Sequence, residues 1–246
     1  MAEQGARHFL PWVRQGSAAG ITNPDSLTPN QPAKVSVSVA LTFTEFNVAS
    51  QVQLYGPADV TAIDPRQVVR TEPRPFTTDY PYNLFPCIEF DRPDFPWLFT
   101  PAKAGVNERL RPWICLVVVK KQDGVRMTRS GSALPVLDIA QSARPDLELP
   151  DLEESWAWAH AQISGAITDN AAALQNAIRQ APERTVSRLL CPRKLDPTTV
   201  YYACVVPTFD VGRKTGVGLP VTETELAQLA PAWQATARAV FLPVFF

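Results

Sequence analysis

Proline is the residue that most constrains how this chain can fold. The sequence holds 24 prolines in 246 residues, close to twice the ordinary share of about 5%. Each proline fixes its own φ angle, removes a backbone donor and disfavours helix at the residue before it. The stretch 77–101 interleaves five prolines with aromatic residues. Disordered segments are poor in aromatic residues, so this composition indicates ordered, packed loops. We therefore expect short strands joined by ordered loops.

Alternating and continuous apolar patterns mark the first strands. From 34 to 46, apolar residues alternate with small polar ones, which predicts a long strand with one buried and one solvated face. Residues 51–57 continue in the same phase and are expected to pair with it. The segment 111–121 is apolar without interruption from 113 to 119, as in a central strand buried on both faces.

The remaining elements are predicted from local signals. Asp151 is a plausible N-cap, with Glu154 at the capping-box position, so we expect a helix over 152–164. Asp123-Gly124 is a turn signal that would fold 125–127 back on 111–121. The further strand candidates are 67–71, 85–90, 133–139, 187–195, 199–206 and 240–246, and the further helix candidates are 170–180 and 223–229.

Together these patterns predict an α+β fold that is β-rich, a sandwich or barrel-like mixed sheet with a few short helices and Pro/aromatic-rich ordered loops. Residues 1–33 are expected to form an N-terminal extended segment. Residues 34–246 are expected to form a single domain with a helical insertion around 151–181. The sequence stops in VFLPVFF, whereas chain ends are usually polar. We therefore expect an N-terminal fragment of a longer protein.

Charge and composition exclude several classes of function. Lys plus Arg number 23 and Asp plus Glu 24, so no basic field is available for nucleic acid. The longest aliphatic run, 114–119, is far shorter than the roughly 20 residues of a membrane span. Two distant histidines, His8 and His160, cannot fill a multi-His metal centre. We expect no cofactor, no membrane insertion, and synthesis and assembly in the cytoplasm.

The four cysteines, Cys87, Cys115, Cys191 and Cys204, show no CxxC spacing. If 187–195 and 199–206 form a hairpin that turns at 197–198, Cys191 stands directly opposite Cys204. Directly opposed residues have Cβ atoms about 4.5–5.5 Å apart. The hairpin therefore predicts neighbouring thiols, which we expect to be reduced in a cytoplasmic protein.

Catalytic motifs are absent from the sequence. It contains no phosphate-binding glycine loop, no G-x-S-x-G and no H-E-x-x-H, and we assign no catalytic residue. One acidic group, Glu89, Asp91 and Asp94, has three interpretations. These carboxylates could form turn caps and ion pairs with nearby arginines, bind a hard cation, or act as a catalytic pair.

Large aromatic residues are the candidates for interfaces. Trp156 and Trp158 are two positions apart, so a helix would place them on different faces. Trp158 would then be covered by another part of the chain or would contact another protein, because tryptophan is enriched in interface anchors. Trp97, Phe245 and Phe246 are the other interface candidates.

Several stretches of the sequence resemble those of a known family. They are FLPWVRQG (9–16), the long block 55–102, RLRPWICLVVV (109–119), LPDLEESWAWAHAQI (149–163) and SRLLCPRKLDPTTVYYACVVPTF (187–209). In these stretches the chain resembles long, uncharacterised bacterial proteins associated with gene clusters for phage-tail-like contractile injection systems. The resemblance implies a structural role and no catalytic residues.

We therefore expect a non-enzymatic structural or assembly component of a large bacterial particle. Its partners would be other subunits or further copies of the chain, and the finished particle could be released or docked on a membrane. One alternative is a glycan- or peptide-binding module with Trp97 and Tyr82 as an aromatic platform. The other is a hydrolase that uses Glu89, Asp91 and Asp94.

Overall fold

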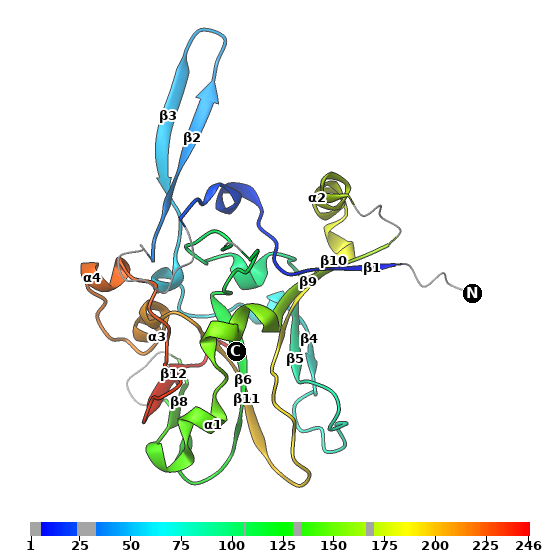
Figure 1. Cartoon of the computed structure of the whole chain (residues 1–246), viewed down its shortest axis with the longest axis vertical. Helices are drawn as coiled ribbons and strands as arrows, with labels where there is room; N and C mark the ends of the chain where they lie inside the picture. The colour runs from blue at the N-terminus through cyan, green and yellow to red at the C-terminus, as the bar shows by residue number, and fades with distance from the viewer. Residues whose placement is uncertain (1–5, 24–32, 106, 130–133, 166–169) are drawn as a thin grey trace.

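The computed structural model describes residues 6–23, 33–105, 107–129, 134–165 and 170–246. The largest sheet has five antiparallel strands in the order β1-β9-β10-β5-β4 (Figure 1). These strands are β1 (Arg7–Leu10), β9 (Ala159–Ser164), β10 (Thr185–Leu190), β5 (Cys87–Phe90) and β4 (Val68–Glu72). The predicted strands 67–71 and 85–90 correspond to β4 and β5, and β1 lies in the segment 1–33.

A central pair of strands separates this sheet from a smaller one. β6 (Ile114–Lys120) and β11 (Tyr201–Pro207) are antiparallel over seven residue pairs. One face of β6 packs against the core that lies below the five-stranded sheet, and the other face packs against the sheet β12-β8-β7. The outer strands are β12 (Val240–Pro243), β8 (Val136–Ile139) and β7 (Val125–Thr128). The prediction of a strand within 111–121 that is buried on both faces is confirmed, but β6 pairs with β11 alone and so does not lie in the middle of a sheet.

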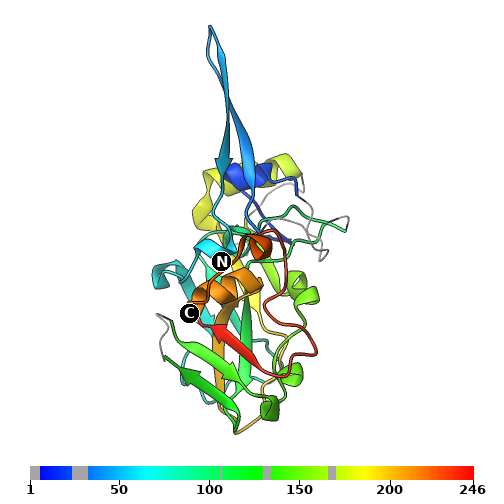
Figure 2. The ribbon, with the colours of Figure 1, turned by 90° about the vertical axis from the view of Figure 1, so that its left-hand side faces the viewer.

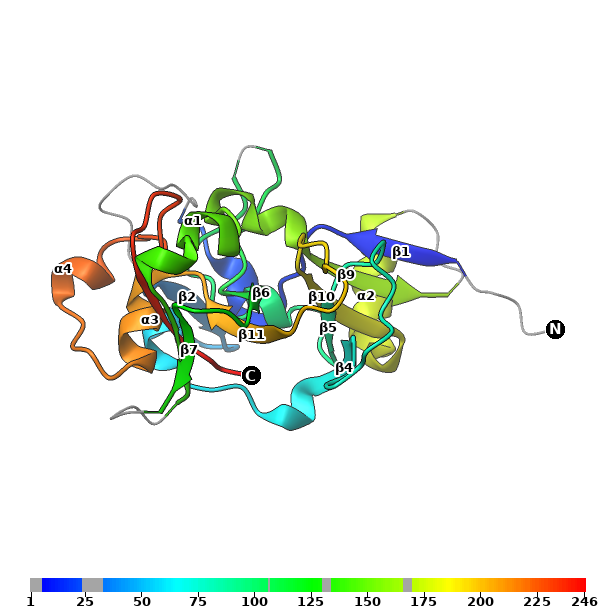
Figure 3. The same cartoon turned by 90° about the horizontal axis from the view of Figure 1, so that it is seen from below.

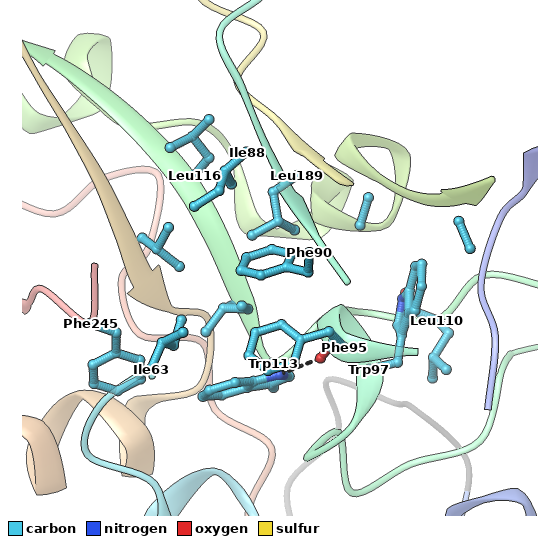
Figure 4. Close-up of a cluster of buried hydrophobic side chains, with 14 of the residues drawn as sticks. Ile63, Ile88, Phe90, Phe95, Trp97, Leu110, Trp113, Leu116, Leu189 and Phe245 are labelled. Atoms are coloured by element: carbon cyan, nitrogen blue, oxygen red, sulfur yellow. Dashed lines mark hydrogen bonds between the residues drawn. The ribbon is translucent and has the colours of Figure 1, made fainter. Parts of the chain in front are cut away.

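The main core is built on aromatic residues from the proline-rich stretch (Figure 4). Phe95 lies between Phe90 and Trp113, with ring centroids 4.4 and 5.9 Å away. The indole of Trp113 donates a 2.8 Å hydrogen bond to the carbonyl of Phe95. The indole of Trp97 donates to the carbonyl of Leu110 at 3.2 Å. Because both buried indoles have acceptors, the rings are fixed without leaving a polar atom unsatisfied.

The helices are short, as the proline content predicts. They are α1 (Pro145–Glu148), α2 (Ala171–Gln180), α3 (Asp210–Gly216) and α4 (Glu223–Leu226), accompanied by 3-10 turns. The helix predicted over 170–180 is confirmed as α2, and the Asn170 side chain caps it by accepting from the backbone of Ala172 at 2.8 Å. The α+β, β-rich class with few short helices is confirmed.

The single helix predicted over 152–164 is wrong. Residues 152–158 form a 3-10 helix, and Asp151 caps it as expected by accepting from the backbone of Glu153 at 2.9 Å. Residues 159–164 are strand β9, which lies between β1 and β10. The segment AHAQIS satisfies a period of two as well as a helical period, and pairing on both sides decides for the strand. The insertion around 151–181 is therefore helical only in part, and its residues 166–169 lie outside the described ranges.

The predicted hairpin of 187–195 with 199–206 is also wrong. β10 pairs with β5 and β9, whereas β11 pairs with β6. Cys204 stands opposite Val117 rather than Cys191. The backbone of Cys191 instead donates to the carbonyl of Pro86 at 2.9 Å. The four thiols are free.

One further pairing differs from the expected one. Residues 125–127, within β7, pair with β8 instead of folding back on β6. The apolar segment 240–246 packs on this chain but leaves Phe241 and Phe246 partly exposed: β12 pairs with β8, and the backbones of Phe245 and Phe246 bond to Val205 at 2.9 Å. Residue 133, the first of the strand predicted over 133–139, lies outside the described residues.

One hairpin stands apart from these layers. β2 (Ser36–Thr42) and β3 (Asn47–Gln53) pair only with each other and project from the body along its longest axis (Figures 1 and 2). The predicted pairing is confirmed, but the second strand covers 47–53 instead of 51–57, so the turn falls within the predicted first strand. We call residues 36–53 the arm.

Candidate functional site

The arm is a regular antiparallel ribbon. Val37 pairs with Val52 and Leu41 pairs with Val48, with no shift in register along seven residue pairs. At the tip, the backbone of Phe43 donates a 2.9 Å hydrogen bond to the carbonyl of Phe46. This bond continues the same register, so Phe43 and Phe46 face each other across the turn.

The register sorts the side chains of the arm onto two faces, because paired residues project to the same side. The apolar face carries Val37, Val39, Leu41, Phe43, Phe46, Val48, Ser50 and Val52. The opposite face carries Ser36, Ser38, Ala40, Thr42, Asn47, Ala49, Gln51 and Gln53. Such a ribbon is built to cover an apolar surface with one side and to face water with the other.

The base of the arm is anchored to the body. Val35 and Val37 form a small buried cluster with Ile21, which follows the 3-10 turn Gly16–Gly20. The backbone of Leu54 donates to the carbonyl of Val35 at 2.9 Å. Just beyond, Gly56 passes so close to the chain that a Cβ atom there would lie 2.4 Å from the carbonyl oxygen of Ala33. The base is therefore fixed, and the arm has a defined direction.

The outer part of the apolar face is exposed. Leu41, Phe43, Phe46, Val48 and Val52 each leave between 41 and 57% of their surface accessible. The rings of Phe43 and Phe46 stack on each other, with centroids 4.8 Å apart, and about half of each side chain stays exposed. The strand predicted over 34–46 to bury one face therefore does so only near its base, where the 3-10 turn covers it.

The edges of the arm lack the usual protection against pairing with other chains. Natural edge strands are guarded by lysines, prolines or bulges. Residues 33–56 contain no proline, although the chain holds 24, and residues 36–53 carry a single charge, that of Glu45. The arm thus combines an exposed apolar face with open hydrogen-bonding edges.

A second exposed apolar surface lies in the loop between β4 and β5, residues 73–86, which we call the aromatic loop. Phe76, Tyr82, Leu84 and Phe85 each leave between 42 and 101% of their surface accessible. Four prolines fall in the loop, and the hydroxyl of Tyr80 donates to the carbonyl of Phe85 at 2.9 Å. The loop is therefore held in shape while its apolar side chains remain accessible.

The predicted interface residues have different surroundings. Trp97 and Phe245 are buried in the core, so they present no surface to a partner and Trp97 cannot form an aromatic platform. Trp158 is half-buried and meets Phe85 edge-on, with centroids 5.9 Å apart, while Phe246 is partly exposed. Sequence reasoning missed the outer half of the arm and the aromatic loop as surfaces, because alternation and aromatic content predict burial as readily as exposure.

The three acidic candidates do not converge on one point. Glu89 is buried and forms an ion pair with Arg188, which also donates to the Gln162 side chain at 2.6 Å. Asp94 is buried and accepts two 3.0 Å hydrogen bonds from Arg92, and Asp91 points to solvent. Of the three interpretations, ion pairing is the one these contacts support. Within the described ranges, no three His, Cys, Asp or Glu side chains are grouped to hold a metal ion.

His160 lies on the outer face of the large sheet, in β9. Phe9 from β1 packs edge-on against the imidazole, with centroids 5.5 Å apart. Partial burial lowers the pKa of His160 below its ordinary value of 6.5, and the neighbouring positive charge of Arg188 lowers it further, against a smaller opposite effect of Glu89. The imidazole is therefore neutral at pH 7 and packs as a structural group.

The buried thiols are not activated. Burial raises the pKa of Cys204 to about 12 and raises the pKa values of Cys115 and Cys191 above the ordinary thiol range. A thiolate is the reactive form of cysteine, so these three side chains are unreactive core residues at neutral pH.

Comparison of the chain with known protein families, with curated proteins and with solved structures finds no match. Among the helices of the described residues, none has the length and apolar character needed to cross a membrane.

Proposed function

We propose that this protein is a non-enzymatic structural or assembly subunit of a large bacterial particle, and that the arm is its principal protein contact. The observation that carries the proposal is the exposed apolar face of a ribbon projecting from a well-packed body. An isolated two-stranded hairpin is at best marginally stable in water. Contiguous exposed apolar surface usually marks an interaction site. A partner that covers this face stabilises both the arm and the assembly.

The sequence resemblance adds the kind of particle to the proposal, a phage-tail-like contractile injection system. Assembly takes place in the cytoplasm, and the finished particle is released or docked on a membrane. The ion pairs of Glu89 and Asp94 support a structural use of these carboxylates over a hydrolytic one, because each is already held by an arginine.

The test compares the full chain with an armless variant in the bacterium that makes it. Because Leu54 donates to Val35 at the base, residues 36–53 can be replaced by Asn-Gly, which forms a tight hairpin turn. The tagged wild-type chain is expected to elute in a particle much larger than its 27.1 kDa, and the armless variant to elute free of it.

The matched control replaces Gln53 on the polar face with Ala and should leave incorporation unchanged. A wild-type chain that elutes at its own mass in the native extract would overturn the proposal, as would an armless variant that enters the particle as efficiently as the wild type.

A further inference from the structure

We propose that the partner of the arm is the aromatic loop of a second copy of this chain, so that copies join head to tail. This inference rests on the proposed function and names the surface that the arm covers. It arises from the presence of two exposed apolar surfaces, the arm and residues 73–86, on one chain.

The placement of the two surfaces excludes a contact within one molecule. Figure 1 shows the arm at one end of the longest axis and the aromatic loop, below β4 and β5, toward the other end. In Figure 3, which looks at the molecule from that other end, the loop overlaps the strands of the large sheet. The loop of one copy therefore cannot cover its own arm, whereas a copy stacked along the axis can.

The amount of apolar surface favours this pairing over a symmetric contact between two arms. A large aromatic residue buries roughly 150–250 Å², so the exposed side chains of the arm offer roughly 400 Å² and those of the loop about as much. Two arms packed face to face would bury about half of the roughly 800 Å² per partner found in stable interfaces, and both aromatic loops would stay exposed. One head-to-tail contact buries a similar area per partner, but in an array each copy makes two such contacts and buries both of its surfaces.

Charge is compatible with the same pairing. Glu45 is the single charge on the arm and lies exposed at its tip. The aromatic loop carries exposed Arg74 and Asp79, and Arg74 takes part in none of the ion pairs among the described residues. A contact that places Glu45 beside Arg74 gains an ion pair, and the remainder of the arm brings no charge that must be desolvated.

A head-to-tail contact uses two different surfaces, so it does not end with a dimer: it continues into a ring or a filament. Each contact can add a further copy, so the extent of association should depend on protein concentration. The purified wild-type chain is therefore expected to show a mass that rises with concentration.

The experiment uses two defective variants and their mixture. The arm variant carries Phe43→Ser with Phe46→Ser, and the loop variant carries Phe76→Ser with Tyr82→Ser. All four side chains lie outside the core, so melting temperatures should stay close to wild type. By sedimentation velocity each variant alone should remain at 27.1 kDa, because one has no functional arm and the other no functional loop.

An equimolar mixture should form a species of twice that mass and grow no further, because it joins one intact arm to one intact loop. A second arm variant, Leu41→Ser with Val48→Ser, should behave as the first and guards against an effect confined to the tip. Gln53→Ala on the polar face should associate as wild type does.

Three results would overturn the inference: a loop variant that associates as well as wild type, a mixture that stays monomeric, or a wild-type chain that is monomeric at every concentration. Each leaves the proposed function intact, because incorporation into the native particle is measured separately with the armless variant. Failure of that incorporation test alone would instead remove the proposed function.

Discussion

The central ribbon β6–β11 and the arm are both antiparallel pairs of seven-residue strands, yet their surroundings are opposite. β6 is apolar at consecutive positions and packs on both faces. The arm alternates between mainly apolar and mainly polar positions and packs on one face, near its base. With size and pairing equal, the side-chain pattern decides whether a ribbon becomes the middle of a core or a surface that another protein can cover.

The edges of the two ribbons also differ: side chains bond to the edge of β6, whereas the edges of the arm are open. On β6, the backbone of Lys120 donates to the carboxylate of Glu148 at 2.9 Å, and Arg193 donates to the carbonyl of Val118 at 3.0 Å. Arg193 and Glu148 are themselves paired at 2.6 Å. Side chains thus satisfy an edge that strand pairing leaves open. Among the described residues, no comparable side chains bond to the outer edges of β2 and β3, so these edges remain available for pairing with another chain.

The largest effect on the free energy of unfolding is expected at Trp113, where the main core meets the ribbon β6–β11. Trp113 is buried and stands immediately before β6, so Trp113→Ala should lower the free energy of unfolding by about 3–5 kcal/mol. Urea denaturation of the full chain measures it, with Trp113→Phe as a milder control. A loss below 1 kcal/mol would contradict the view that this region carries the stability of the body.

The next largest effect on the free energy of unfolding is expected at the edge of β6, where Glu148 and Arg193 bond to the backbone. Arg193→Ala leaves the buried Glu148 carboxylate without its main cation, and removing one partner of such a pair costs about 3 kcal/mol or more. Arg193→Lys keeps the charge and loses the two-pronged contact, so it should be less damaging. The measurement is again urea denaturation at pH 7. Equal stability of wild type and Arg193→Ala would show that the edge needs no cap.

A smaller effect on stability, and one that depends on pH, is expected from His160 in the body. Its pKa is lowered in the folded state, so the unfolded chain takes up a proton first as the pH falls. Stability should therefore be complete above pH 6.5 and decline as the pH drops from there toward the folded pKa. Melting temperatures between pH 8 and pH 5 measure the decline, and His160→Gln should flatten it. A steeper decline in the variant would reverse the assignment.

The smallest effect on stability is expected in the arm. Leu41→Ser at low protein concentration should change the free energy of unfolding by less than about 0.5 kcal/mol, because an exposed side chain loses little on substitution. The same variant should impair association at high concentration. If Leu41→Ser instead destabilises the dilute monomer as strongly as a core substitution, the arm is packed on the body and the contrast between the two ribbons fails.

Local pattern predicted the individual strands better than their partners. The continuous apolar run of β6 and the alternation of β2 gave correct elements, because each depends on neighbouring residues. The errors came from pairing: β10 and β11 are close in sequence but belong to different sheets, and β9 became a strand because β1 and β10 flank it. A partner strand elsewhere in the sequence leaves no mark on a local period.

The site was predictable only in part. The two-faced character of the arm follows from alternation, yet the pattern does not reveal that the body ends halfway along the ribbon. Similarly, the aromatic residues of 77–101 divide between the core, as Trp97 does, and the surface, as Tyr82 does. Their composition is the same, and the fold alone separates them.

The paired strands of the arm are close in the sequence and those of the body are far apart, and this difference affects the order of folding. Phe43 and Phe46 close the arm across two intervening residues, and local hairpins form in roughly 1–10 μs. The body instead joins β6 to β11 and β1 to β9 across long stretches of chain, and β-rich domains of this kind fold in roughly milliseconds to seconds. In a newly made chain the two strands of the arm therefore meet well before the body that anchors and orients them has formed.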